Sequence, residues 1–297
     1  MEILSNCTLC PRRCGANRES GNVGFCGADD KIKIARCALH FWEEPCISGK
    51  NGSGTVFFSH CSMKCAYCQN YKISRFGIGK VISTNELADC FLKLAEDGAN
   101  NINLVTPTHY VPQIIEAVAI ARKKGLRLPI IYNSSGYETP ETIKMLNGTI
   151  DIYLPDMKYF DDRYAIRYSG APNYFKIASR AISEMFSQVG KCVFNERGMI
   201  KKGVIVRHLM LPGLLFDSKK IIDYLFSTYG DDIFLSIMNQ YTPTEALPAD
   251  FPELNKKISE KYYNSLIDYA VNLGIKNAYI QDGDTAKESF IPEFFGE

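Results

Sequence analysis

The sequence has little excess charge, no long apolar run, no internal repeat and no low-complexity segment. Its 34 basic and 33 acidic side chains give a net charge of +1, so it lacks the basic field of proteins that bind nucleic acid or membranes through charge. No run of about 18 apolar residues occurs, and residues 1–14 lack the apolar core of a signal peptide. These absences predict a cytoplasmic protein that binds neither membrane nor nucleic acid.

Cysteine is scarce after residue 68 and abundant before it. Nine of the 11 cysteines lie in the first 68 residues, and only Cys90 and Cys192 follow. A reducing cytoplasm disfavours structural disulfides and favours metal binding. Cysteines that merely filled a core would be scattered along the chain, so the clustering predicts metal sites.

The chain is predicted to divide near residue 50. Residues 1–50 are rich in Cys, Gly, Arg and Asn without a long apolar period, and are expected to form a Cys-rich metal-binding arm. In residues 51–297, apolar strands alternate with amphipathic helices. Strands are predicted over residues 55–59, 101–105, 128–132, 150–154, 203–210, 233–237 and 277–280. Helices are predicted over residues 85–97, 111–124, 140–146, 161–168, 174–189, 218–229 and 256–273.

This alternation predicts an α/β fold. Continuous apolar strands that are each followed by a helix are typical of a parallel sheet with helix-covered outer faces. Six or more such units indicate a partial β/α barrel of the (β/α)6 type. In β/α barrels the ligands bind at the carboxyl ends of the strands.

A cysteine triplet follows the first of these strands. Cys61, Cys65 and Cys68 have the spacing C-x3-C-x2-C within the segment 59–70. Three thiolates without a fourth cysteine in step suit a cubane iron–sulfur cluster with one iron left open. Zinc is the alternative and needs a fourth ligand. His60 is adjacent, but neighbouring side chains on a strand point to opposite faces, which favours iron–sulfur.

With Tyr67 before its third cysteine, the triplet resembles the signature of the radical S-adenosylmethionine (SAM) superfamily. The resemblance covers residues 52–240 and is closest to proteins called pyruvate formate-lyase activating enzyme-like. It implies an activating-enzyme-like radical SAM oxidoreductase whose [4Fe–4S] cluster binds SAM and receives an electron from a donor such as flavodoxin or ferredoxin. SAM is then cleaved reductively to a 5′-deoxyadenosyl radical that abstracts hydrogen from a protein, peptide or small-molecule substrate. The glycine loop of a glycyl-radical enzyme is one such substrate.

Two strand ends carry polar residues that are expected to bind SAM. Thr106 and Thr108 follow the second strand, where family members usually have a Gly-Gly-Glu-type segment, and offer hydroxyl and carbonyl acceptors. Asn133 and Ser135 follow the third strand in Asn-Ser-Ser-Gly, which resembles the Asp-Thr-Asn-Gly segment of glycyl-radical activating enzymes. They are predicted to contact the ribose or carboxylate of SAM. A plain turn before a helix is the alternative for the threonines.

Two further strands supply charges. Asp156 and Lys158 stand in a segment that resembles Leu-Asp-Leu-Lys of the same enzymes. Since they are two residues apart in an extended segment, both are expected to face the cavity; a surface ion pair is the alternative. Arg207 lies in an apolar strand that resembles the Arg-Tyr-Val-Val-Val-Pro-Gly stretch, in which the arginine meets SAM. A buried charge is costly unless paired, and a guanidinium suits a carboxylate. No catalytic residue is predicted.

The arm carries a second cysteine pattern, C-x2-C-x3-C-x11-C. Four thiolates can enclose either an iron–sulfur cluster or a zinc ion, and the sequence leaves both open. Cys37 and Cys46 are alternative ligands, and unliganded thiols are the alternative to a metal site. Activating enzymes with extra clusters usually hold them after the triplet, whereas these cysteines precede it. The predicted ligands are Cys7, Cys10, Cys14 and Cys26.

A second functional class also fits the cysteines, namely a metal-cluster protein that binds RNA or a partner without turnover. The polar candidates Thr106, Asn133 and Arg207 are all expected on one rim of the barrel, together with the triplet. A binding module has no need of that arrangement, so the sequence favours the enzyme.

Overall fold

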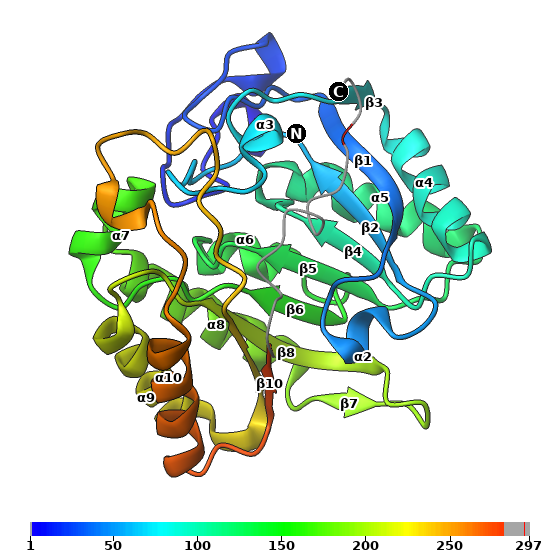
Figure 1. Cartoon of the computed structure of the whole chain (residues 1–297). Helices are drawn as coiled ribbons and strands as arrows, with labels where there is room; N and C mark the ends of the chain where they lie inside the picture. The colour runs from blue at the N-terminus through cyan, green and yellow to red at the C-terminus, as the bar shows by residue number, and fades with distance from the viewer. Residues whose placement is uncertain (1, 282–293, 295–297) are drawn as a thin grey trace.

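The computed structural model describes residues 2–281 and 294, which form a mixed α/β structure (Figure 1). Its strands belong to one ten-stranded sheet. They are β1 (Ile32–His40), β2 (Ser53–Phe58), β3 (Lys80–Ile82), β4 (Ile102–Val105), β5 (Ile130–Ser134), β6 (Ile152–Pro155), β7 (Val193–Phe194), β8 (Ile200–Leu209), β9 (Phe234–Met238) and β10 (Ala278–Ile280). The order across the sheet is β10-β9-β8-β6-β5-β4-β2-β1-β3, with β7 paired to β8 outside this path.

The strands from β2 to β10 along this order are parallel, as the sequence predicts. Their register brings the carboxyl ends to one edge, because Val105 of β4 lies opposite both Phe57 of β2 and Asn133 of β5. In the described part of the chain β3 and β10 are the two ends of the order, so the sheet stays open. The predicted partial barrel is therefore confirmed.

Helices surround the sheet in Figure 1. The α-helices are α1 (Glu2–Ser5), α2 (Pro45–Ser48), α3 (Tyr71–Ser74), α4 (Thr84–Glu96), α5 (Val111–Lys123), α6 (Pro140–Met145), α7 (Asp162–Ser169), α8 (Tyr174–Val189), α9 (Leu215–Tyr229) and α10 (Glu260–Asn272). Short 3-10 turns are η1 (Arg18–Ser20), η2 (Thr108–Tyr110), η3 (Gly230–Asp232) and η4 (Pro252–Leu254). None of the helices in residues 2–281 has the length and apolar character needed to cross a membrane.

Local sequence explains where α4 begins. Ser83 Oγ accepts a hydrogen bond from the backbone N–H of Glu86 at 3.2 Å, and the Glu86 carboxylate accepts the Ser83 N–H at 2.7 Å. This capping box satisfies two otherwise unpaired donors at the helix start. The side chains of Leu87, Phe91 and Leu94 then point into the core on one face.

The strand β1 is absent from the elements predicted from sequence, which include none in residues 1–50. Polar residues such as Lys33 and Arg36 interrupt its apolar pattern. It forms because it pairs antiparallel with β2 on one side and with β3 on the other, so tertiary context decides its structure. The division at residue 50 stays a prediction. Its second part, 51–297, includes residues 282–293 and 295–297, which lie outside the described residues.

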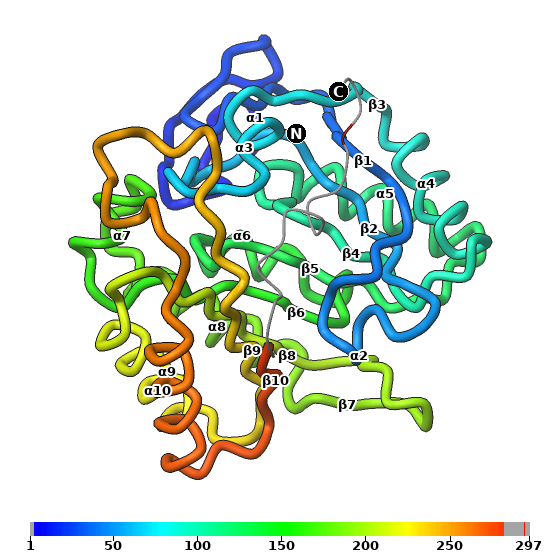
Figure 2. The backbone as a smooth tube through the Cα atoms, viewed as in Figure 1, coloured from blue at the N-terminus to red at the C-terminus, as the bar shows by residue number. Residues whose placement is uncertain are grey.

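The N-terminal segment lies beside the loop that carries the cysteine triplet. Figure 2 shows the blue chain before β1 next to α3 at the same end of the sheet. Arg12 joins the two, since its Nε donates to the carbonyl of Ser62 at 3.0 Å. Arg18 is fully buried and donates to the carbonyls of Asp29 and His109. The predicted arm is therefore packed against the barrel.

Candidate functional site

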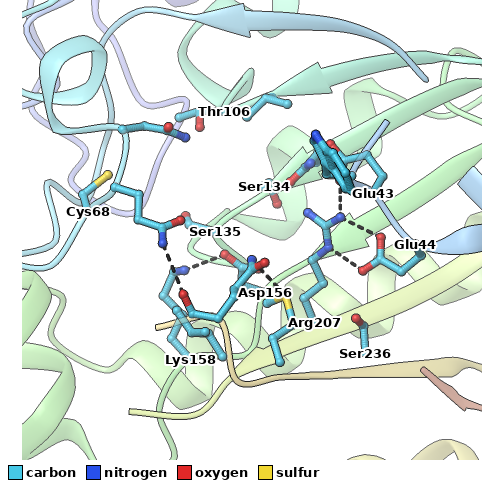
Figure 3. Close-up of a pocket in the computed structure, with 18 of the residues that line it drawn as sticks. Glu43, Glu44, Cys68, Thr106, Ser134, Ser135, Asp156, Lys158, Arg207 and Ser236 are labelled. Atoms are coloured by element: carbon cyan, nitrogen blue, oxygen red, sulfur yellow. Dashed lines mark hydrogen bonds and ion pairs between the residues drawn. The ribbon is translucent and has the colours of Figure 1, made fainter. Parts of the chain in front are cut away.

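A cavity of about 510 Å³ lies at the carboxyl ends of the parallel strands. Residues from the triplet loop, from the ends of β4, β5, β6, β8 and β9, and from the segment 40–45 line it. Figure 3 shows Cys68 on one side of this cavity and Glu43, Glu44 and Arg207 on the other. The site is thus where a β/α barrel is expected to bind its ligand.

The three cysteines of the triplet line this cavity together, and each of their sulfurs accepts a hydrogen bond. Hydrogen bonds to cysteine sulfurs are among the features that tune iron–sulfur clusters. The donor set therefore fits a thiolate-bound cluster. The donors to Cys61, Cys65 and Cys68 are, in that order, the backbone N–H of Met63 at 3.4 Å, the hydroxyl of Ser169 at 2.9 Å and the hydroxyl of Ser74 at 3.4 Å.

Burial makes Cys61 and Cys68 poor thiolates on their own. It raises the pKa of Cys61 to about 12, and it raises the pKa of Cys68 as well. A bound cation reverses this preference, because a coordinating thiol is deprotonated. Within residues 2–281 and 294, no three Cys, His, Asp or Glu side chains converge on a single-ion site. A cubane cluster differs from a single ion in this respect, because each thiolate binds a different iron.

Tyr67 connects to the triplet through a chain of hydroxyls. Its hydroxyl lies 2.7 Å from that of Tyr159, which lies 2.7 Å from the hydroxyl of Ser169, the donor to Cys65. Tyr67 and Tyr159 are buried, and Tyr67 lines the cavity. Sequence pattern alone identifies Tyr67 but not Tyr159 or Ser169, which come from a distant part of the chain.

The ends of β4 and β5 are joined at the cavity. Thr106 has a positive φ of 57°, which is rare for a β-branched residue, and its N–H donates to the carbonyl of Asn133 at 2.9 Å. Thr106, Asn133 and Ser135 all line the cavity. Gly136 has a φ of 75°, and a Cβ there would lie 2.1 Å from the carbonyl of Asp156, so the turn requires glycine.

Thr108 is placed differently from the sequence-based expectation. It is buried and donates to Glu138 Oε1 at 3.0 Å, and it is not among the described residues that line the cavity. Glu138 also accepts a bond from Ser134 Oγ at 3.0 Å, so it holds the β4 and β5 loops together. Burial raises the pKa of Glu138 to about 7. Sequence reasoning missed this residue, since a single Glu after a turn carries no signal.

Asp156 and Lys158 both face the cavity, as expected. Lys158 Nζ lies 2.5 Å from Asp156 Oδ2, and their side chains are 15% and 22% exposed. This is therefore a mostly buried pair rather than a surface pair. Burial alone would lower the pKa of Lys158, but the neighbouring Asp156 carboxylate outweighs burial and raises that pKa.

Arg207 also reaches the cavity, but with partners that the sequence does not reveal. Its Nε donates to Glu44 Oε1 at 2.7 Å and its Nη2 to Glu44 Oε2 at 2.6 Å, and Nη2 also pairs with Glu43. All three side chains are nearly buried. Burial would raise the pKa of Glu44, but Arg207 lowers it. Nη1 donates no hydrogen bond to the described residues, and Figure 3 shows the Nη1 side of the guanidinium facing the cavity.

The four cysteines of the arm lie close to one another. Burial raises the pKa of Cys10 to about 11, and Cys26, Cys7 and Cys14 contribute to this rise by their proximity. Gly24 permits the arrangement, because a Cβ there would lie 2.3 Å from Cys14 Sγ.

The two alternative ligands, Cys37 and Cys46, lie elsewhere. The side chain of Cys37 hydrogen-bonds that of Cys90, and Cys46 packs in an apolar cluster with Ile47 and Ile131. Neither is positioned with the four cysteines of the arm.

Comparison with known proteins is informative at the level of the family. A sequence model of the radical SAM superfamily matches residues 55–225. A protein of Methanocaldococcus jannaschii described as uncharacterized protein MJ0674 is 29% identical over 287 residues, which are 93% of this chain and 78% of that protein.

Solved structures share the fold at low identity. A radical SAM methyltransferase from Sphaerobacter thermophilus has a TM-score of 0.54 at 15% identity, over 77% of this chain and 66% of that one. Methylornithine synthase PylB has a TM-score of 0.51 at 13% identity, over 74% and 60%. Streptococcus suis SuiB bound to S-adenosylmethionine has a TM-score of 0.50 at 13% identity over 75% of this chain, which spans about half (48%) of SuiB. With the family match over more than half its length, the chain belongs to the radical SAM superfamily, whose members are enzymes that use SAM and a [4Fe–4S] cluster.

Proposed function

We propose that Cys61, Cys65 and Cys68 hold a [4Fe–4S] cluster with one open iron, and that the cavity binds SAM against it. One observation carries the proposal. The three cysteines, whose sulfurs each accept a hydrogen bond, line the same cavity as the polar residues of the strand ends. When bound, the cluster and SAM supply a 5′-deoxyadenosyl radical that takes a hydrogen atom from the substrate.

The chain's own residues bind and orient SAM in this proposal. Thr106, Asn133 and Ser135 offer hydroxyl, amide and carbonyl groups at the ends of two neighbouring strands. Nη1 of Arg207 faces the cavity and is a donor for the carboxylate or ribose. Asp156, Lys158 and Tyr67 line the same cavity. Thr108 affects SAM binding indirectly, because its hydrogen bond to Glu138, which also binds Ser134, fixes the loops that follow β4 and β5.

The overall reaction belongs to an oxidoreductase. A small electron carrier such as flavodoxin or ferredoxin would reduce the cluster, and the cytoplasm, which keeps free cysteines reduced, is the proposed location. The substrate is a protein, a peptide or a small molecule, and a glycyl-radical enzyme is one such partner. Fold neighbours include a methyltransferase, methylornithine synthase and SuiB, which has been solved bound to a precursor peptide. This range on one fold means that the substrate has to be inferred from the site.

The test is spectroscopic. Reconstituted and reduced protein should show an EPR signal that changes when SAM is added, and 5′-deoxyadenosine should accumulate. The variant Cys61→Ala/Cys65→Ala/Cys68→Ala should lose both. An EPR signal of cluster-loaded wild-type protein that does not change when SAM is added would contradict the proposal.

A second metal at Cys7, Cys10, Cys14 and Cys26 is also proposed. Their mutual proximity and the glycine that accommodates Cys14 support a four-thiolate site for iron–sulfur or zinc. No three described side chains converge on a single ion, so the arrangement favours a cluster over zinc. Metal analysis of the triplet variant should therefore still find iron or zinc. The variant Cys10→Ala/Cys14→Ala should lose that metal and loosen the arm, because metal binding contributes folding energy to small segments. A triplet variant without either metal would show that the arm holds none.

A further inference from the structure

The wall of the cavity opposite the cysteines carries two carboxylates around one guanidinium. Glu43 and Glu44 come from the segment between β1 and α2, and Arg207 comes from β8. Their side chains are 6%, 5% and 14% exposed. The three groups therefore form a buried cluster with a net charge of −1.

No other lining residue among those that the structure describes offsets this charge. The remaining charged side chains in the lining, Asp156 and Lys158, pair with each other at 2.5 Å. His40 also lines the cavity, and burial lowers its pKa, which favours the neutral imidazole at pH 7. Among the described residues the lining thus has three anions and two cations, before any cysteine thiolate is counted.

The hydrogen bonds of Glu43 and Glu44 show which carboxylate carries the excess negative charge of the lining. Both oxygens of Glu44 are bound by Arg207. Within the described part of the chain, each oxygen of Glu43 receives a single bond, one from Arg207 and one from Asn103 Nδ2 at 3.0 Å. A carboxylate has about four acceptor positions, so Glu43 keeps two. Asn103 is fully buried, and its Oδ1 has no partner in the described chain. Asn103 does not line the cavity, whereas Glu43 does, so the free acceptor positions of Glu43 are the ones that a donor from a ligand can reach. Such a donor is favoured because an unpaired buried polar group is costly.

We propose that this wall is a subsite for a cationic group of the substrate, a primary ammonium or a guanidinium, and that Glu43 accepts its N–H donors. The assignment rests on the proposed function, since it names a substrate class for the same cavity. A cation compensates the excess charge and supplies several donors at once. Trp42 adds an aromatic surface to the lining beside Glu43, and aromatic faces attract cations.

Trp42 also provides the assay, because it is the chain's single tryptophan. Anaerobic, reconstituted and unreduced protein is titrated with n-butylammonium and n-butylguanidinium, and in parallel with n-butanol and butyrate, while Trp42 fluorescence is recorded. The two cations should give saturable changes that the neutral and anionic probes do not. A capped Gly-Lys-Gly peptide is titrated in the same way. Its Kd, compared with that of n-butylammonium, shows whether the wall binds the ammonium group better in a peptide or in a small amine.

Variants assign the effect to Glu43. Glu43→Gln should raise the Kd for n-butylammonium by about tenfold to a hundredfold, the range for losing a charge-assisted bond. Glu43→Asp keeps the charge and should retain selectivity for cations. Glu116→Gln, the same change at an exposed position of α5, should bind like wild type and serves as the matched control.

Three results would overturn the inference. They are equal responses to butylammonium and butyrate, an unchanged Kd in Glu43→Gln, and loss of the butylammonium response when SAM is saturating. The last would mean that the wall serves SAM itself. Reductive cleavage of SAM is measured on the same wild-type preparation and tests the proposed function separately. Protein that cleaves SAM without preferring cations refutes only the subsite, and protein that prefers cations without cleaving SAM refutes only the reaction.

Discussion

Replacing Arg207 by Met should destabilise the protein strongly, for reasons that have nothing to do with SAM. Arg207 makes three hydrogen bonds to Glu43 and Glu44 in a nearly buried setting. Removing the cation leaves two buried carboxylates unpaired, and breaking a buried pair in this way costs about 3–5 kcal/mol. Urea unfolding of cluster-free protein, followed by circular dichroism under reducing conditions, measures the loss.

Two comparisons isolate the cause. Adding Glu43→Gln and Glu44→Gln to the Met variant should recover more than half of the lost stability, because no charge is then left unpaired. Arg163→Met removes the same side chain from an exposed pair with Asp161 and should have a much smaller effect. If Arg207→Met costs no more than Arg163→Met, the buried cluster does not stabilise the fold and the reasoning fails.

The same cluster predicts a dependence on acid. Arg207 lowers the pKa of Glu44 in the folded state, so the unfolded chain binds a proton at a higher pH than the folded one. The contribution of Glu44 to stability is therefore present at neutral pH and is lost as the pH falls below about 4. Urea midpoints of wild type should show this loss, and those of Glu44→Gln should show less of it.

Two further predictions concern residues that hold the site. Ser169→Ala removes the 2.9 Å hydrogen bond to Cys65 and should make the reduction potential of the cluster more negative by roughly 30–70 mV. Ser74→Ala, which removes a 3.4 Å hydrogen bond to Cys68, should shift the potential less. Equal potentials in redox titrations of wild type and Ser169→Ala would contradict this prediction. Because burial raises the pKa of Glu138 to about 7, the folded state binds the proton more tightly, and stability should fall by about 3 kcal/mol as the pH rises from about 4.5 to 7. Glu138→Gln should flatten that slope in urea unfolding, and an unchanged slope would mean that another group causes it.

The parallel strands could be predicted from sequence because each is a short apolar run followed by a helix with its own start and stop signals. The strand β5 illustrates the limit of this method, since it was expected at 128–132 and lies at Ile130–Ser134. Its carboxyl end includes the polar residues Asn133 and Ser134, which belong to the strand because they pair with Leu154 and Pro155 of β6. Local composition places the element, and pairing with neighbours sets its ends.

The site could be predicted only where a residue stands in a recognisable segment. Asp156 and Lys158 were expected to face the cavity because alternation along an extended segment places them on one side, and they do. Thr108 was expected, together with Thr106, to offer hydroxyl and carbonyl acceptors to SAM. The turn η2 begins at Thr108, however, and directs its side chain to Glu138. A change from extended to helical backbone within two residues is not visible in composition.

Glu43 and Glu44 were missed for a different reason. They precede the short helix α2, in a part of the chain that showed no apolar period, so nothing local suggested burial. Only the fold brings them to Arg207, more than 160 residues away. The segment predicted as a separate arm therefore supplies one wall of the cavity, while its residue Arg12 contacts Ser62 in the loop of the cysteine triplet. Deleting residues 1–50 would remove more than the proposed metal site, because it would also leave Arg207 without its counter-charges.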